Sequence, residues 1–409
     1  MVNKLNSLVD QVWNKNAKCL RITKHSKRWW SEECNKALTN YRTSRSLNDW
    51  KTFKRVVKNT KRAFFDLKIQ EVADKSCSPW ELMNWINKYK LPATEAIKYE
   101  GQPCLILENL WCALHATFNT ALHQQVDTEI FNKLSPKPTI VWAPFSKEEF
   151  RQALVKCNNS SASGPNKLIW RHLKIILNQD SCLSHIINIV DMCINLGHWP
   201  NHFKHSSIVI IPKPNKLAYD SPKSFCPIVL LNTIGKLIKK VITKRLQFHV
   251  IKNDFIHPSQ LGGLKFKSTT DARIALSHII RSGWIKNKTT STLAFDIAQF
   301  FPSLNHYMLI ISLAKVGLNP KVIFFFKDFL VKRKTNYTWN EFFSPTFEVN
   351  VGVGQGSALS PILSALYLSS LLYILEKQLK TLNIPISLLY FVDDGLFISQ
   401  NKSIDVLYS

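Results

Sequence analysis

The sequence predicts an α+β protein in which a helical N-terminal region precedes a part that mixes helices with short strands. Apolar residues recur at helical intervals through the first 130 residues. From Ser206 onward the pattern changes to short β-branched runs that alternate with further helical stretches. Near the C-terminus two apolar runs flank Asp393-Asp394-Gly395, a sequence suited to a tight hairpin in which the glycine takes a positive φ.

Residues 1–135 are predicted to form a basic helical region. Apolar side chains stand at helical spacing at Trp50, Phe53, Val57, Phe64 and Leu67, with basic residues between them. This pattern indicates an amphipathic helix whose cationic outer face either contacts RNA or is simply solvated. The segment Leu134-Ser135-Pro136-Lys137-Pro138 predicts a linker, because proline denies hydrogen bonds to helix and sheet alike. A domain boundary near residue 135 follows.

Residues 140–205 are predicted to be a second helical segment, and 206–290 a segment that begins with strands. Ser146 and Glu149 match a capping box, with Phe145 and Phe150 placed as a hydrophobic staple, so a helix should begin at Lys147. Its end is marked by Ser160 to Gly164. The run Ser207 to Ile211 predicts a strand that stops at Pro212, and Lys213 to Lys216 predicts a basic turn. Helices are expected over Leu231 to Ile251 and Asp271 to Ile285.

The charge of the chain is unusual for its otherwise ordinary composition. Of 409 residues, 45% are hydrophobic and 20% are charged, but 54 Lys and Arg against 28 Asp and Glu leave a net charge of +26. Such an excess favours a polyanionic partner through counterion release, and nucleic acid is the partner we expect. An acidic membrane surface is the weaker alternative, because the basic residues are spread along the chain and do not gather beside one apolar segment.

The cysteines and the N-terminus predict an intracellular protein of the nucleus or cytoplasm. Nine cysteines are scattered without any C-x-x-C pair, which fits neither a zinc ribbon nor a disulfide framework. The first residues lack the apolar core of a secretory signal. Leu359 to Leu375 is the most apolar stretch, but Pro361 and several serines interrupt it, so we expect a buried helix and no membrane span.

Three motifs together predict a metal-dependent reaction. The β-prone run Ser291 to Phe295 leads directly into Asp296, which should lie at the end of a strand, beside the hairpin carrying Asp393 and Asp394. Adjacent aspartates in a turn are ordinary surface residues when taken alone. In an apolar setting, however, like charges are costly unless a cation compensates them, and hard divalent cations prefer carboxylate oxygen. The third motif is the glycine-rich Gly352-Val353-Gly354-Gln355-Gly356-Ser357, where glycine allows the backbone to approach a base pair closely.

Taken in order, these motifs resemble the palm of the reverse transcriptases of non-LTR (LINE-like) retrotransposons. The likeness extends to Trp29-Trp30-Ser31, Ser161-Ala162-Ser163-Gly164-Pro165, the segments 211–216 and 224–232, and Gln260-Leu261-Gly262-Gly263 with the following 268–272. The resemblance implies a right-hand polymerase fold, with fingers over 206–290 and a palm over 291–409. It also implies an RNA-directed DNA polymerase that takes an RNA template, a DNA primer and a dNTP, with no membrane partner.

The resemblance also implies roles for individual residues. Asp296, Asp393 and Asp394, with Ile297 completing the set, would hold two Mg²⁺ ions, with Mn²⁺ as the alternative metal. Phe301 would be the steric gate against a ribose 2′-hydroxyl, or else would only pack in the core beside Phe300. Gln355 and Gly356 would line the pocket for template and incoming base. Lys213 would face the triphosphate, or else would be a solvated turn lysine.

Departures from the family pattern predict weak activity. Cys226 stands where the resemblance implies an arginine that stacks on and neutralises the nucleotide, and a thiol can do neither. Lys239 stands where an acidic residue is expected, and Asn166 where aspartate is expected. The chain stops 15 residues after Asp394, so we expect a truncated palm and no thumb. Two alternatives therefore stay open: a degenerate copy that only binds RNA, and a maturase-like nucleic-acid-binding cofactor. We expect little or no primer extension from the chain as it stands.

Overall fold

The computed structural model describes residues 29–74, 96–119, 137–159, 161–214, 218–339 and 342–402, together with residue 216 and isolated residues between 4 and 15 and between 121 and 129. The chain divides into two compact units, one formed by residues 12–93 and the other by residues 94–409 with 1–11. The linker expected at Leu134 to Pro138 lies largely outside the described residues, which include only its last two positions.

The described residues of the smaller unit form two helices, α2 (Glu32–Ser44) and α3 (Leu47–Ala73). Helix α2 begins after Ser31, whose hydroxyl accepts a hydrogen bond from the main-chain N–H of Cys34. Aromatic rings join the two helices, because Tyr41 of α2 lies 4.9 Å from Trp50 of α3 between ring centroids. The helix predicted from Trp50 to Leu67 is therefore present as part of α3. Lys54 is exposed on this helix, and its ammonium lies over the ring of Trp50.

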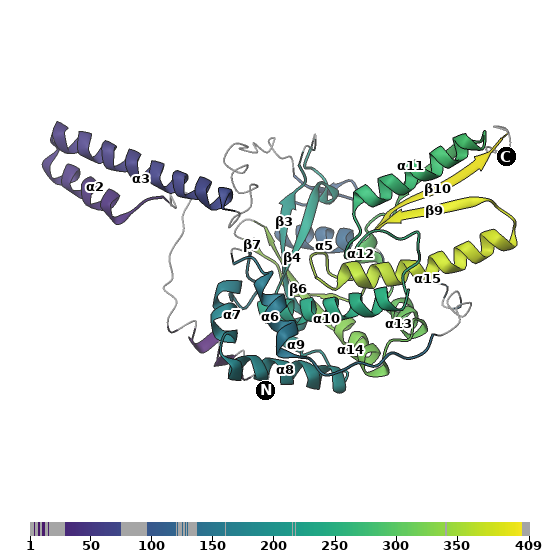
Figure 1. The fold of residues 1–409 in the computed structure, drawn as a ribbon. Coiled ribbons are helices and arrows are strands. Elements are labelled where there is room, and N and C mark those ends of the chain that lie inside the picture. The colour runs from purple at the N-terminus through teal and green to yellow at the C-terminus, as the bar shows by residue number, and fades with distance from the viewer. Residues whose placement is uncertain are drawn as a thin grey trace. The chain divides into compact units, whose positions relative to one another are not determined.

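The described part of the larger unit contains a five-stranded and a three-stranded sheet (Figure 1), besides a separate two-stranded hairpin. The five-stranded sheet has the order β4-β3-β6-β7, with β8 also paired to β6, and its strands are β3 (His205–Pro212), β4 (Phe225–Leu231), β6 (Arg333–Trp339), β7 (Phe342–Phe343) and β8 (Phe347–Val349). Strands β3 and β6 are parallel, whereas the other pairs are antiparallel. The strand expected over Ser207 to Ile211 is thus confirmed as the middle of β3.

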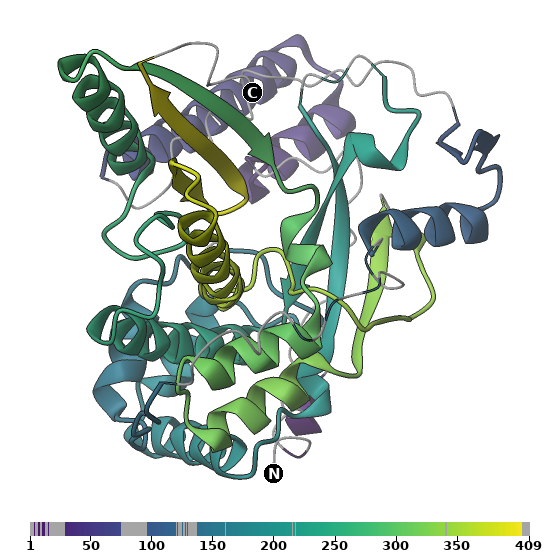
Figure 2. The ribbon, with the colours of Figure 1, turned by 90° about the vertical axis from the view of Figure 1, so that its right-hand side faces the viewer.

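The three-stranded sheet has the order β5-β10-β9, and it carries the acidic motifs. Its strands are β5 (Thr289–Asp296), β9 (Ile386–Phe391) and β10 (Asp394–Asn401), all antiparallel. Figure 2 shows helix α11 (Thr269–Ile285) lying along this sheet. Leu389 and Ile398 point toward α11, while Leu388 and Tyr390 of the opposite face join the main core. Helix α11 therefore covers one face of the sheet, and the opposite face packs against the main core.

The remaining helices surround one large core. They are α5 (Leu107–Phe118), α6 (Lys147–Val155), α7 (Trp170–Leu177), α8 (Asp180–Asn195), α9 (Asn201–Lys204), α10 (Thr233–Lys252), α12 (Phe300–Ser303), α13 (His306–Lys315), α14 (Pro320–Leu330) and α15 (Ser360–Thr381), with a short 3₁₀ turn at Pro222–Ser224 and a two-stranded hairpin of β1 (Lys98–Tyr99) and β2 (Gln102–Pro103). Helices α6, α7, α8, α10, α13, α14 and α15 all contribute buried apolar side chains to this core.

Local predictions for these helices are confirmed, with one correction. Helix α6 begins at Lys147 with the complete capping box of Ser146 and Glu149, and the ring centroids of Phe145 and Phe150 lie 6.1 Å apart. It ends at Val155, earlier than the expected Ser160 to Gly164, because Lys156 already leaves the helical pattern. Among the helices of the described segments, none is long and apolar enough to cross a membrane. The α+β class is confirmed, while the domain limits and the absence of a thumb stay predictions.

Candidate functional site

The three aspartates meet at one end of the three-stranded sheet. In the antiparallel register, Asp296 at the end of β5 lies directly opposite Asp394 at the start of β10. Asp394 also pairs with Phe391, so that Val392 and Asp393 form the two-residue turn between β9 and β10. The main-chain N–H of Ile297 donates to the carbonyl of Asp393 at 3.1 Å, which ties the residue after Asp296 to the turn. The neighbouring-strand arrangement expected from the sequence is therefore present.

The electrostatics of this end of the sheet favour a bound cation. Asp296 and Asp394 are exposed and Asp393 is half-buried. Burial raises the pKa of Asp393, and the charges of Asp296 and Asp394 raise it further. In the part of the chain that the structure describes, no group of three His, Cys, Asp or Glu side chains, the three aspartates included, is arranged so that it could hold a metal ion by itself. An open set of carboxylates nevertheless suits Mg²⁺, which is bound through one or two carboxylates and keeps waters and substrate phosphates as its other ligands.

The acidic turn differs from the prediction in which residue takes the positive φ. The left-handed residue is Val392, with φ of 62°, and Gly395 lies inside strand β10. A β-branched residue is disfavoured in this region, so the turn is strained. Gly395 is required for another reason: a Cβ there would collide with the ring of Phe295, its partner on β5. Gly395 therefore makes space for the ring of Phe295, and Val392 is the residue of the turn that has the positive φ.

A loop after α10 holds the strained turn in place. The side chain of Gln260, which is 1% exposed, accepts a hydrogen bond from the main-chain N–H of Val392 at 3.2 Å and donates one to its carbonyl at 3.3 Å. The same side-chain oxygen accepts from the N–H of Gly262 at 2.9 Å. A Cβ at Gly262 would collide with the main-chain nitrogen of Val392. In the sequence, Gln260 and Gly262 belong only to the family resemblance, and no local pattern predicts this contact.

The glycine-rich loop is fixed to the segment that follows Asp296. Gly352 has φ of 68°, and its N–H donates to the carbonyl of Leu304 at 2.8 Å. The N–H of Val353 donates to the carbonyl of Phe301 at 2.7 Å. Phe301 is half-buried, with its ring centroid 5.7 Å from that of Phe300. The glycine-rich loop and the predicted gate residue are therefore neighbours.

The predicted base-pocket residues and the predicted triphosphate residue lie near strand β4. Gln355 and Gly356 are exposed, and a Cβ at Gly356 would be 3.7 Å from the carbonyl oxygen of Val229 on β4. Lys213 follows β3, and its N–H donates to the carbonyl of Ser224 at 2.9 Å. Cys226 is half-buried on β4, paired with Ile211. The structure thus forms two groups of predicted residues: the acids at the small sheet, and the β3–β4 hairpin with the glycine-rich loop.

The two other departures noted in the sequence are buried. Asn166 is 7% exposed, and within the described chain neither polar atom of its side chain has a hydrogen-bond partner. Lys239 is 3% exposed on α10. Burial, and to a smaller extent the charges of Arg333 and Lys236, lowers the pKa of Lys239 to about 7. On the surface either side chain would be solvated at no cost. In these buried positions, each lowers the free energy of unfolding because its polar group loses its contact with water.

Known proteins are similar in sequence to the region of the chain that contains these two groups of residues. Residues 211–407 match the family model described as reverse transcriptase (RNA-dependent DNA polymerase). The RNA-directed DNA polymerase from mobile element jockey of Drosophila funebris is 25% identical over 224 residues, covering 55% of this chain and 24% of that protein. The Pol polyprotein from the R2 retrotransposable element of Popillia japonica is 24% identical over 233 residues, covering 52% and 30%.

One further relative and one solved structure are also similar to part of this chain. A probable RNA-directed DNA polymerase from transposon BS of Drosophila melanogaster is 21% identical over 332 residues, covering 78% of this chain and 36% of that protein. A telomerase structure from Candida tropicalis gives a TM-score of 0.37 at 17% identity, covering 51% of this chain and 46% of that chain. The chain spans only about a quarter to a third of the length of these curated relatives.

Proposed function

Over residues 211–407 this chain belongs to the reverse transcriptases of non-LTR retrotransposons, and from this premise we propose that it carries out RNA-directed DNA synthesis by two-metal nucleotidyl transfer. The observation that carries the proposal is the register pair of Asp296 and Asp394 with Asp393 at the adjacent turn. Three carboxylates at one sheet end supply the donor set that two divalent cations need.

In this proposal the acidic end of the sheet is the catalytic centre. Asp296, Asp393 and Asp394 would hold two Mg²⁺ ions, or Mn²⁺ as the alternative, with Ile297 beside them. When bound, such a pair of ions stabilises the attacking 3′-hydroxyl oxygen and the leaving pyrophosphate oxygen of an in-line displacement. The raised pKa of Asp393 supports the assignment, because uncompensated like charges next to an apolar sheet are relieved by a cation.

The neighbouring segments would position the substrates. Phe301 would contact the sugar of the dNTP, which its half-buried position at the joint with the glycine-rich loop supports. Gln355 and Gly356 are exposed, as a surface for template and incoming base requires. Lys213 would face the triphosphate from the end of β3. Its main-chain N–H donates to the carbonyl of Ser224 across the hairpin, which fixes the backbone from which the side chain extends.

Each predicted region of the chain would have its own role in this reaction. Residues 206–290 would act as fingers, 291–409 as palm, and 140–205 as the helical support behind them. The basic outer side of α3 in the 1–135 region would contact the RNA template and DNA primer. The net charge of +26 supports a nucleic-acid partner, and the affinity for RNA should then fall steeply as salt rises.

A second candidate function has observations of its own. Cys226 supplies no positive charge at the position of the expected arginine, and Lys239 buries a cation where an acidic residue was expected. A protein with the same fold that only binds RNA would tolerate both. The maturase-like alternative has less support, because a protein without polymerase chemistry has no need of three clustered aspartates.

Primer extension on an RNA template with Mg²⁺ tests the proposal. We expect little or no synthesis from the chain, more from Cys226→Arg, and none from Asp393→Asn in either background. Asp180→Asn, which makes the same change at an exposed position at the start of α8, is the control and should leave synthesis unchanged. Synthesis that survives Asp393→Asn would contradict the assigned site. If Cys226→Arg also gives no product while RNA still binds, the second candidate function is the correct one.

A further inference from the structure

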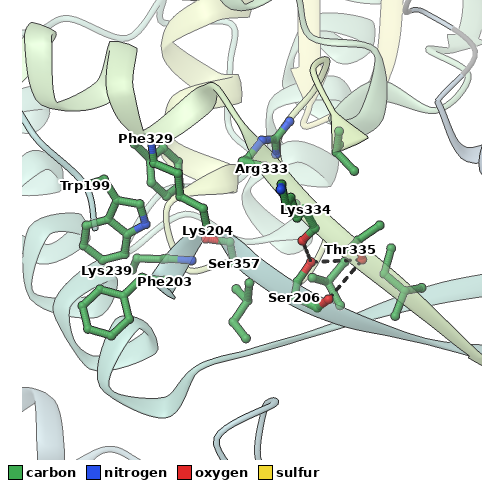
Figure 3. Close-up of a pocket in the computed structure, with 15 residues that line it drawn as sticks. Trp199, Phe203, Lys204, Ser206, Lys239, Phe329, Arg333, Lys334, Thr335 and Ser357 are labelled. Carbon is green, nitrogen blue, oxygen red and sulfur yellow. Dashed lines mark hydrogen bonds between the residues drawn. The ribbon is translucent and has the colours of Figure 1, made fainter. Parts of the chain in front are cut away.

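A cavity of about 80 Å³ lies between strands β3, β4 and β6, helix α10 and the glycine-rich loop, away from the acidic end of the small sheet. Figure 3 shows the rings of Trp199, Phe203 and Phe329 along one side and the polar side chains of Ser357 and Lys239 turned toward the interior. The proposed polymerase reaction assigns no role to this cavity.

The cavity is strongly cationic. Lys204, Lys239, Arg333 and Lys334 line it, and none of its lining residues is an aspartate or glutamate. Lys204 is neutralised from outside the lining by Asp328, at 2.9 Å between ammonium and carboxylate. Arg333 donates to the carbonyls of Val351 at 2.6 Å and Gly352 at 2.8 Å, which accept its hydrogen bonds but do not cancel its charge.

Among the described residues, neither Lys239 nor Lys334 has a hydrogen-bonded or ion-paired acceptor for its ammonium, but Lys334 is exposed to solvent whereas Lys239 is 3% exposed. Its side chain is buried, and its ammonium lies 5.3 Å from the ring centroid of Phe329 and 5.8 Å from that of Trp199. Cation–π contacts of this kind offset only part of the loss of hydration.

Two more donors in the wall of the cavity have no partner. The indole Nε1 of Trp199 and the hydroxyl of Ser357 are buried without a hydrogen bond to any described residue. Trp199 is 1% exposed and Ser357 7%. An indole N–H can only donate, and a buried donor left unpaired costs about 1–3 kcal/mol. The ammonium of Lys239, the indole N–H of Trp199 and the hydroxyl of Ser357 therefore line one cavity, and no described residue accepts a hydrogen bond from any of them.

We propose that this cavity is a binding site for a small free oxyanion of the phosphate class, with Lys239, Ser357 and Trp199 as its ligands. A tetrahedral oxyanion presents several acceptor oxygens to donors that converge from different elements, whereas a halide presents one centre. The size agrees, because one buried water needs about 10–15 Å³ on the same measure, and the volume of about 80 Å³ exceeds this minimum several-fold.

Calorimetric titration of the full chain with inorganic phosphate tests this inference, at constant ionic strength and without nucleic acid. We expect saturable binding to the unmodified chain and a rise in Tm of about 2–4 °C at saturation, neither of which chloride should reproduce. Lys239→Met should weaken phosphate binding by about tenfold or more, since it removes the charge-assisted hydrogen bond. Ser357→Ala should weaken it by a smaller factor.

Lys327→Met is the matched control, because Lys327 is exposed on α14 and loses the same charge outside the cavity. It should bind phosphate like the unmodified chain, which separates the site from the general attraction of a basic protein. If Lys239→Met does not fold, the Ser357→Ala comparison still decides. Absence of saturable binding, or binding unchanged in both cavity variants, would overturn the inference. None of these outcomes depends on polymerase activity.

Discussion

The side chain of Gln260 bonds to both the N–H and the carbonyl of Val392, at 3.2 and 3.3 Å, and so takes the place of a strand partner for the residue that precedes Asp393. Val392 has φ of 62°, a conformation that a β-branched residue adopts only when its surroundings impose it. The position of the catalytic carboxylates in our proposal therefore depends on a residue that touches none of them.

Replacing Gln260 with leucine should loosen the acidic turn. The change keeps a similar volume but leaves the main-chain groups of Val392 without their partner, at an expected cost of about 1–3 kcal/mol in unfolding free energy. Urea unfolding measures the loss. Gln152→Leu on the exposed face of α6 is the control, and should change stability by less than about 0.5 kcal/mol. Equal effects of the two substitutions would show that the buried contact has no special importance.

Gly262→Ala should displace the turn directly. The new methyl group would collide with the main-chain nitrogen of Val392, so either the loop or the hairpin must move. Overpacking of this kind costs about 1–3 kcal/mol. Gly354→Ala is the control, because a Cβ at Gly354 would meet nothing within 4 Å. Thermal unfolding should show a lower Tm for Gly262→Ala alone, and a tolerated Gly262→Ala would be evidence against the tight packing of loop on turn.

Asp393→Asn should stabilise the protein while removing its proposed reaction. Burial and like charges raise the pKa of Asp393, so its ionised form destabilises the fold once the pH is above that pKa. The neutral amide removes this penalty, and because the residue is only partly buried we expect a gain below about 1 kcal/mol. Mg²⁺ should raise the Tm of the unmodified chain more than that of Asp393→Asn. Equal Mg²⁺ responses would argue against Asp393 as a ligand.

Lys239 should make stability depend on pH in the alkaline range. Its pKa is about 7 in the folded chain, against 10.5 for a lysine side chain in water. Between these values the unfolded chain binds a proton that the folded chain does not, so stability rises with pH from about 7 toward 10.5, by at most about 1.4 kcal/mol per pH unit. Below pH 7 the penalty is fully present.

The variant Lys239→Met isolates this effect from the other charged groups around the cavity, which are Lys204 with Asp328, Lys236, Arg333 and Lys334. In phosphate-free buffer it should be more stable than the unmodified chain by several kcal/mol at pH 7, and the difference should shrink by about 2 kcal/mol at pH 9. Urea unfolding at the two pH values measures it. A difference that does not change with pH would mean that Lys239 stays charged in the folded protein.

Much of the local structure follows from the sequence because it is decided by near neighbours. The capping box of Ser146 and Glu149 predicts the start of α6 at Lys147, since both partners lie within one helical turn. The β-prone run before Asp296 and the apolar runs around Asp393 and Asp394 likewise predict strands that end in acids. The chemical character of the site is therefore readable from the chain itself.

The tertiary structure decided what depends on distant residues. It paired Asp296 with Asp394 residue by residue, gave the positive φ to Val392 in place of Gly395, and placed Gln260 behind the turn. It also buried Lys239, which local pattern alone would leave on the cationic face of a helix. Register, burial and the residue that occupies a strained turn are set by packing between segments that lie about a hundred residues or more apart in the chain. The sequence by itself thus determined which groups are available for the proposed chemistry, and the packed fold determined where they lie and which residues hold them.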